Sequence, residues 1–237
     1  MNKEKIMNEF HHAFLSARCF ARLKDSGVGN YEEIFLFALR TYGSQRGRRM
    51  AQRALRDGRP LDFASYRYYS EWSFTQDFLA DAGTFFRETE RGENYFYEVY
   101  DCPWNRIYQQ LDLPDGALLY CLDLDKAIAH GFNPDLKYEV ERFEDAPLLC
   151  RQMQFDAHLE CDPDYPASDP ANKRDFTYHC GHILAVFRQV LQNCLGDRGS
   201  AIIDGVLSDF AAQFGADDCS SVLSASNNNF DSIELEP

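Results

Sequence analysis

Hydrophobic residues recur along this chain with two different periods. Spacings of three and four predict a helix over residues 4–24 and a longer one over residues 31–55, separated by glycines that predict a short turn. We therefore expect an antiparallel helical hairpin at the N-terminal end. The same spacing returns in residues 174–215 and predicts a second pair of helices, each closed by a glycine.

The middle of the chain alternates with the period of two that strands have. Residues 94–100 are aromatic and β-branched, and residues 136–141 and 149–158 alternate in polarity. Residues 144–147 supply a turn between the last two, which predicts an antiparallel hairpin. The whole pattern indicates an α+β fold: an N-terminal helical hairpin, a small antiparallel sheet with helices packed on it, and a C-terminal helix pair.

We predict a single domain. The length is enough for one large domain or two small ones, and no internal repeat or low-complexity tract interrupts the chain. Its parts are a helical segment over 1–60, a core over 61–160 and a second helical segment over 174–215, within residues 1–237. Residues 162–172, rich in proline and aspartate, predict a surface loop. The tail from Asp217, rich in serine and asparagine, has few apolar side chains to bury.

Composition and charge narrow the class of protein. Apolar residues make up 45% and charged residues 26% of the 237, which is typical of a folded globular domain. The net charge of −14 argues against nucleic acid as a partner, because phosphate would be repelled. No apolar stretch is long enough for a membrane helix and no secretion signal is recognisable, so we expect a cytoplasmic protein. A small-molecule substrate is the expected partner, and a homo-oligomer stays open.

Eight cysteines are spread along the chain, and none forms a C-x-x-C pair. A zinc ribbon or a thioredoxin-type motif is therefore disfavoured, and reduced thiols are expected. We expect no cofactor. A metal held by cysteines with aspartate or histidine stays open as an alternative.

The segment Asp101-Cys102-Pro103-Trp104 follows a predicted strand. Proline is favoured in the first turn of a helix, so Cys102 would lie at a helix N-terminus. Free backbone N–H groups and the helix dipole favour a thiolate there, which predicts a nucleophile. The structural alternative is an inert, buried capping cysteine.

A second candidate is the pair Cys121 and Asp125, which share one face if this segment is helical. Such a pair could bind a metal or hold a polar substrate, while Asp123 points to another side of the helix. Ordinary helix capping by aspartate is the structural alternative.

Two histidines and an arginine run complete the candidates. His179 and His182 lie three residues apart on an apolar helix face, where buried structural histidines are common and binding sites rarer. Residues 40–59 hold seven arginines and one acid, so Arg48, Arg49 or a neighbour could bind a substrate carboxylate, although charge pairing is the simpler reading. The G-x-x-x-G spacing in the same segment allows another backbone to approach closely.

Several short motifs occur in an order that resembles the L-2-amino-thiazoline-4-carboxylic acid hydrolase family. The likeness covers about residues 35–160, and Ala146 departs from it where a glycine is expected. The motifs are Tyr42-Gly43, Gly47-Arg48-Arg49-Met50-Ala51, Cys102-Pro103-Trp104, Tyr120-Cys121 with Asp123 and Asp125, Gly131-Phe132-Asn133-Pro134, and Cys150.

The resemblance implies an α+β domain akin to the vinyl-reductase-like and transport-particle-like ligand-binding folds, and a hydrolase that opens a cyclic amidine-type C–N bond. We expect the distant cysteines and acids to surround one pocket. The expected catalytic residues are Cys102, Cys121, Asp125 and Asp123. Cys102 would be the nucleophile or a ligand that polarises the attacked carbon, Asp125 or Asp123 would handle protons, and direct attack by an activated water stays open. The expected substrate-binding residues are Trp104, Asn133, Cys150, Arg48, Arg49 and His182. The alternative is a non-catalytic domain that binds or senses a small molecule.

Overall fold

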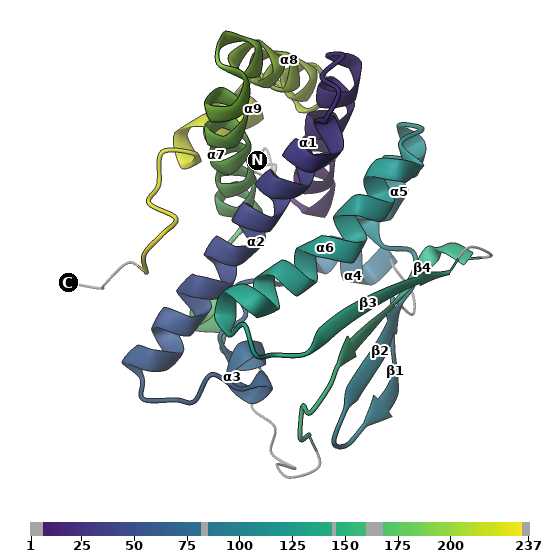
Figure 1. The fold of residues 1–237 in the computed structure, drawn as a ribbon, viewed down its shortest axis with the longest axis vertical. Coiled ribbons are helices and arrows are strands. Elements are labelled where there is room, and N and C mark those ends of the chain that lie inside the picture. Colours follow the sequence, from purple (N-terminus) through teal and green to yellow (C-terminus); the bar gives the residue numbers. More distant parts are fainter. Residues whose placement is uncertain (1–6, 82–84, 144–145, 160–167, 234–237) are drawn as a thin grey trace, which may run out of the picture.

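Helices precede and follow a small antiparallel sheet along the chain, and the sheet lies at one edge of the structure, so the α+β prediction is confirmed (Figure 1). The computed structural model describes residues 7–81, 85–143, 146–159 and 168–233. In chain order the elements are α1 (Glu9–Asp25), α2 (Tyr31–Arg56), α3 (Phe63–Tyr68), α4 (Gln76–Asp81), β1 (Phe86–Arg91), β2 (Tyr95–Val99), α5 (Pro103–Gln110), α6 (Pro114–Phe132), β3 (Tyr138–Phe143), β4 (Ala146–Gln154), the short 3₁₀ turn η1 (Pro170–Asn172), α7 (Phe176–Leu195), α8 (Asp197–Phe214) and α9 (Ala216–Ala225).

The four described strands lie in the order β1-β2-β4-β3, and all neighbours are antiparallel. β3 and β4 form the predicted hairpin, although residues 144–145 of its turn lie outside the described residues. In the β2–β4 pairing Tyr97 lies opposite Gln152, and Val99 lies opposite Cys150. Since side chains alternate along a strand, these four residues share one face of the sheet.

The sequence pattern does not predict β1. Its six residues, FRETER, are all exposed, so no alternation of apolar and polar residues marks it as a strand. β4 begins three residues earlier than predicted and ends at Gln154, because Asp156 adopts a positive φ of 56° that takes the chain out of the sheet. β3, in contrast, begins two residues later than predicted. Before it, the N–H of Leu136 donates to the carbonyl of Asn133 and closes a turn.

The two long helices α2 and α6 pack closely at glycine positions, as the G-x-x-x-G spacing indicates. A Cβ atom on Gly47 would overlap the backbone of Ile128, and one on Gly131 would overlap the backbone of Ser44. Backbone therefore meets backbone at this crossing. This contact fixes α6 over the sheet, where it also runs along β3 (Figure 1).

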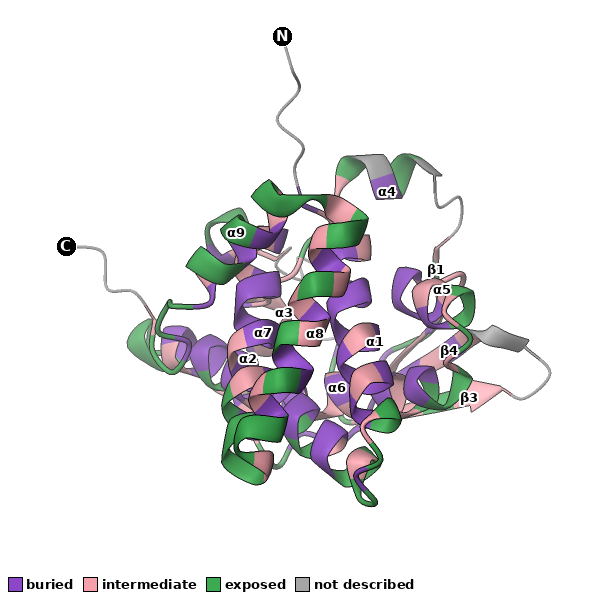
Figure 2. Ribbon diagram, turned by 90° about the horizontal axis from the view of Figure 1, so that it is seen from above, coloured by how far each residue is buried: buried purple, intermediate pink, exposed green. Residues whose placement is uncertain are grey.

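The helices α1, α7, α8 and α9 form the rest of the core, with buried residues on their facing sides (Figure 2). The expectation that the tail from Asp217 buries little is wrong. Cys219 and Val222 of α9 are buried against the neighbouring helices, and Phe230 is buried beyond it. α9 packs on α7, where a Cβ on Gly181 would overlap Ala225.

α1 begins at Glu9 rather than at residue 4, because a capping box forms its N-terminus. The Asn8 side chain accepts a hydrogen bond from the N–H of Phe10, and His11 accepts one from the N–H of Asn8. Residues 1–6, where we expected the helix to start, lie outside the described residues.

Candidate functional site

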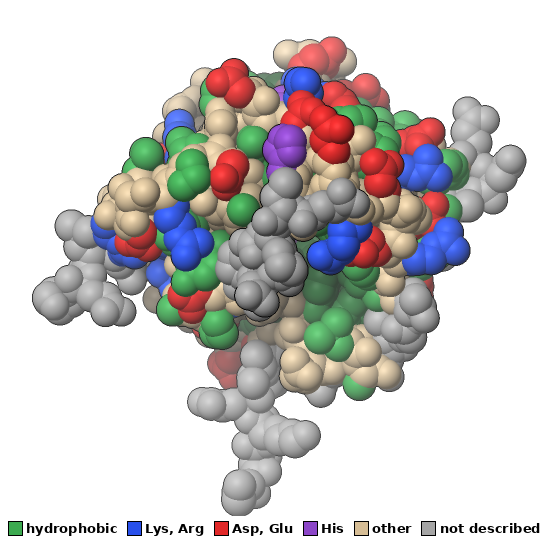
Figure 3. Space-filling model, turned by 90° about the horizontal axis from the view of Figure 1, so that it is seen from below, with side chains coloured by type: hydrophobic (Ala, Val, Ile, Leu, Met, Phe, Trp, Pro, Cys, Tyr) green, Lys and Arg blue, Asp and Glu red, His purple; other side chains and the backbone are tan. Residues whose placement is uncertain are grey.

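A cavity of about 510 Å³ lies between the sheet and the long helices α2 and α6. It is the size of pockets that hold small organic ligands. β2 and β4 contribute the side chains of alternate residues, including Tyr97, Val99, Cys150 and Gln152. Seen from below, hydrophobic side chains gather on one part of the surface between charged ones (Figure 3).

The cavity collects five of the site residues that the sequence predicts. Cys102 and Trp104 come from the start of α5, Cys121 and Asp125 from one face of α6, and Cys150 from β4. Residues up to 48 positions apart in sequence therefore line the same space. The thiols and the carboxylate are near enough to influence one another's pKa.

Cys121 is the cavity thiol with a cationic hydrogen-bond partner among the described residues. Nη1 of Arg142, on β3, donates to Sγ of Cys121 across 3.0 Å. Burial raises the pKa of the Cys121 thiol, while the charge and the hydrogen bond of Arg142 lower it again. The result is a smaller rise than at the other two cavity cysteines.

The expected low pKa of Cys102 is wrong. Cys102 does precede α5, and the N–H groups of Asn105 and Trp104 lower its pKa, but burial and the nearby Cys121 raise it well above the ordinary thiol range. Burial also raises the pKa of Cys150, to about 12. The desolvation of a thiolate in this apolar space outweighs the start of one short helix.

Asp125 is held by an amide. Nε2 of Gln152 donates to Oδ2 of Asp125 at 3.2 Å and also approaches Sγ of Cys150 at 3.5 Å. Burial raises the pKa of Asp125, and the nearby charge of Arg46 and the Gln152 bond counteract part of that rise. A carboxyl with a raised pKa can both accept and release a proton closer to neutral pH.

Arg46 is a site residue that we missed. Its side chain is 5% exposed, lines the cavity, and lies over the rings of Trp72 and Tyr42 at 5.0 and 5.6 Å. Within the described residues, no carboxylate lies within ion-pair distance of it, and its buried Nε has no hydrogen-bond partner. Burial lowers the pKa of Arg46, but Tyr42 and Glu71 outweigh burial and raise the pKa overall, so the guanidinium stays charged. The sequence signal for Arg46 is its position between Tyr42 and Met50, at a spacing of four on the apolar stripe of α2.

Gln152 and Gln154 were also missed as site residues. Both are buried and line the cavity, and Oε1 of Gln152 has no hydrogen-bond partner among the described residues. They lie on the polar face of the alternating segment 149–158, and that face is the one turned to the cavity. A run of polar residues on a buried strand face therefore marks the site.

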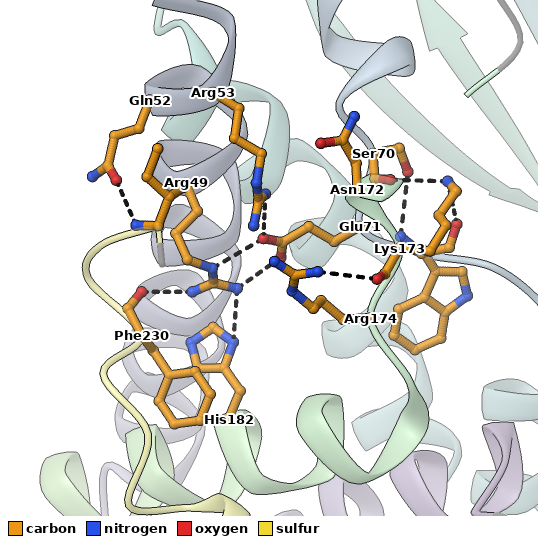
Figure 4. A network of polar contacts seen from close by, with 12 residues as sticks. Arg49, Gln52, Arg53, Ser70, Glu71, Asn172, Lys173, Arg174, His182 and Phe230 are labelled. Atoms are coloured by element: carbon orange, nitrogen blue, oxygen red, sulfur yellow. Dashed lines mark hydrogen bonds and ion pairs between the residues drawn. The ribbon is translucent and has the colours of Figure 1, made fainter. Parts of the chain in front are cut away.

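The arginines that we expected to bind a carboxylate serve other contacts (Figure 4). Arg49 is buried and donates to Oε1 and Oε2 of Glu71 at 3.0 and 2.7 Å, and to the carbonyl of Phe230. Arg53 donates to Oε1 of the same Glu71. Arg48 is exposed and pairs with Asp231. Charge pairing, the simpler reading of this arginine run, therefore holds for these three side chains.

Three further expected residues lie outside the cavity. Asp123 pairs with Arg40 at 2.6 Å on the outer side of α6. Asn133 ends α6 and donates to the carbonyl of Leu61. His182 is fully buried, contacts Oε1 of Gln45 and stacks on Phe230, and burial lowers its pKa well below the ordinary range. Geometry therefore opposes a substrate contact for all three, because none lines the cavity.

Two buried hydrogen bonds in series hold Trp104 in the cavity wall. Its Nε1–H donates to Nδ1 of His12 at 3.0 Å, and Nε2 of His12 lies 3.0 Å from the hydroxyl of Tyr42. Burial lowers the pKa of His12 far below the ordinary range, so the ring is neutral. Since Nδ1 accepts, Nε2 carries the hydrogen and donates to Tyr42.

The described part of the chain holds no group of three or more histidine, cysteine or acidic side chains that could bind a metal ion. Among the described helices, none is both long and apolar enough to cross a membrane.

A family model described as L-2-amino-thiazoline-4-carboxylic acid hydrolase matches residues 7–143, more than half of the chain. This chain belongs to that family. The match includes Arg46, Cys102, Cys121, Asp125 and Arg142, but ends before β4. No curated protein and no solved structure matches the chain. Cys150 and Gln152 lie on β4, beyond the residues that the family model matches.

Proposed function

We propose that this protein hydrolyses the C–N bond of a small cyclic amidine that carries a carboxylate, within the cavity described above. The observation that carries the proposal is that Cys121 and Asp125 both line this cavity, while Arg142 donates a hydrogen bond to the Cys121 thiol. The family name supports a hydrolase of this kind.

Cys121 is the nucleophile in this proposal, in place of Cys102. Arg142 favours the Cys121 thiolate through a charge-assisted hydrogen bond. Asp125, one helical turn along on the same face of α6, is the proton acceptor and donor. Its raised pKa suits both roles.

The reaction then proceeds in two balanced halves. The reacting form is the amidinium, with a proton on its ring nitrogen. The Cys121 proton passes to Asp125, Sγ bonds to the amidinium carbon, and the C=N electrons move to the ring nitrogen, which becomes an N–H amine. Asp125 gives its proton to this nitrogen as the ring C–N bond breaks, and the amino substituent forms a C=N bond to the carbon, which stays attached to Sγ. Water adds to this carbon and gives one proton to Asp125. As the bond to Sγ breaks, the remaining O–H proton passes to the freed amine, and Asp125 returns its proton to the Cys121 thiolate. One water is consumed and one amine is freed.

Two cavity residues complement the ends of such a substrate. Arg46 supplies a buried, charged guanidinium for the carboxylate. Oε1 of Gln152 supplies an acceptor for an amidine N–H group. A zwitterionic ligand would therefore find opposite charges at Arg46 and Asp125.

The test is turnover of L-2-aminothiazoline-4-carboxylate by the purified protein, followed through the primary amine that ring opening releases. Cys121→Ser is expected to lose at least about a thousandfold in kcat/KM, as removal of a covalent nucleophile does. The matched control is Cys194→Ser, which removes an exposed thiol of α7. Full turnover by Cys121→Ser would overturn the nucleophile, and binding without turnover by the wild type would favour the non-catalytic alternative.

A further inference from the structure

The lining of the cavity changes character across the sheet. β4 contributes the thiol of Cys150 and the amide of Gln152, β3 contributes the ring of Tyr138, and α6 above them contributes Cys121 and Asp125. The bond-making steps of the proposed chemistry use Cys121 and Asp125 on this side. On the side of β2 and β1 the lining turns to aromatic rings, starting with Tyr97.

The aromatic side is built from three neighbouring phenylalanines and the rings that contact them. Phe74 and Phe85 meet edge to face with centres 4.7 Å apart, and Phe86 lies 4.9 Å from Tyr97. Phe86 is 43% exposed although it lines the cavity. An exposed ring inside a pocket is apolar surface that a ligand can cover.

The cavity is larger than the small substrate of the proposed chemistry would fill. An aminothiazoline carboxylate is one five-membered ring with two small substituents, whereas pockets of about 300–1,000 Å³ hold drug-sized ligands. At about 510 Å³, this cavity would leave its aromatic side in contact with water or empty space when the small ring alone is bound. Apolar walls without partner atoms lose dispersion contacts, so a larger ligand is favoured.

We propose that the ligand of this cavity is a carboxylate-bearing amidine with an aromatic substituent, which packs against Phe74, Phe85 and Phe86. The inference rests on the proposed function for the place of the amidine. Arg46 holds the carboxylate, and the substituent extends along β2 towards β1.

The experiment measures binding, so that it is independent of turnover. The chain has two tryptophans, Trp72 and Trp104, and both line the cavity, so intrinsic fluorescence reports on it directly. The probes are N-amidino-L-alanine and N-amidino-L-phenylalanine, open-chain guanidines that differ by one phenyl group, and the carboxamide of the latter. They are titrated into Cys121→Ser, Phe86→Ser and the control Phe37→Ser, which changes an exposed ring of α2 outside the cavity.

We expect the phenyl probe to bind at least about tenfold more tightly than the alanine probe. That preference should shrink in Phe86→Ser, persist in Phe37→Ser and Cys121→Ser, and the carboxamide should bind more weakly. Equal affinity for the two acids would overturn the inference even if aminothiazoline carboxylate is hydrolysed. A phenyl preference in a protein that hydrolyses nothing would support the inference and reject the proposed function.

Discussion

Arg142 of β3 donates a hydrogen bond to Cys121 of α6, which lines the cavity, with Nη1 of the arginine 3.0 Å from Sγ of the cysteine. The contact distinguishes Cys121 from Cys150 and from Cys102, which the sequence favours as the nucleophile. Cys102 has backbone N–H groups near it and Cys150 has a neutral amide, whereas Cys121 has a fixed positive charge. A fixed positive charge stabilises a thiolate more than neutral donors do.

Arg142→Gln should therefore make Cys121 less reactive. A hydrogen bond to a charged group is worth about 1.5–3 kcal/mol, so alkylation of Cys121 by iodoacetamide at neutral pH should slow about tenfold or more. The rate is measured by mass spectrometry of the Cys121 peptide. Arg48→Gln, which removes an exposed arginine that pairs with Asp231, is the control and should leave the rate unchanged. An unchanged rate in Arg142→Gln would mean that the contact does not activate the thiol.

Asp125 should give the enzyme an acid limb in its pH profile. Burial raises the pKa of this carboxyl, so the ionised, proton-accepting form is lost as pH falls through a value above the ordinary 3.8. kcat/KM should decline there in the wild type, and Asp125→Asn should lose activity by about a hundredfold or more and lack this limb. A limb that persists unchanged in the variant would assign it to another group.

The same raised pKa predicts an effect on stability with a definite sign. Because the folded state favours protonated Asp125, ionisation opposes folding as pH rises through its unfolded and folded pKa values. The melting temperature of Asp125→Asn relative to the wild type should therefore increase from acid to neutral pH. A difference that is flat or falls with pH would contradict the burial of this carboxylate.

Glu71 should be one of the most costly single side chains to neutralise. Burial raises its pKa, but Arg49 and Arg53 outweigh burial and lower the pKa below the ordinary value. The stability that the ionised Glu71 carboxylate contributes is present above pH 4.5, and it is lost as pH falls through the lowered pKa of the folded state. Glu71→Gln should cost about 3–5 kcal/mol in urea unfolding at pH 7, because two buried cations lose their partner. Glu33→Gln, at an exposed position of α2, should change stability by less than about 0.5 kcal/mol.

Gly47 should not accept a methyl group. Its Cβ would overlap the carbonyl of Ile128, so Gly47→Ala should cost about 1–3 kcal/mol by forcing α2 and α6 apart. Gly29→Ala, where a Cβ meets nothing within 4 Å, is the matched control. Equal unfolding midpoints for the two variants would show that the helix contact is loose enough to adapt.

Sequence periodicity was sufficient for the elements that bury one face. α2, β2 and the β3–β4 hairpin follow from it, and the motif order was sufficient to bring Cys102, Cys121 and Cys150 to one site. β1 could not be found this way, because its side chains are exposed and its pairing with β2 is made by backbone. Periodicity reports burial, and an edge strand buries little.

The choice among neighbouring arginines could not be made from sequence. Arg46, Arg48 and Arg49 lie within one helical turn, and their roles depend on what each meets across space. Glu71 reaches Arg49 from a loop 22 residues away, Asp231 reaches Arg48 from the far end of the chain, and Arg46 is left to the cavity. Likewise, the pKa of Cys102 depends on burial by distant elements rather than on its own helix.

The central claim is that the Cys121 sulfur bonds to the amidine carbon during turnover. Rapid acid quenching of the wild type in the presence of L-2-aminothiazoline-4-carboxylate, followed by peptide mass spectrometry, tests it most directly. The account predicts that the peptide containing Cys121 gains the mass of the opened substrate, and that Cys121→Ser gains none. Turnover with no adduct on Cys121, or with the adduct on Cys102 or Cys150, would contradict it.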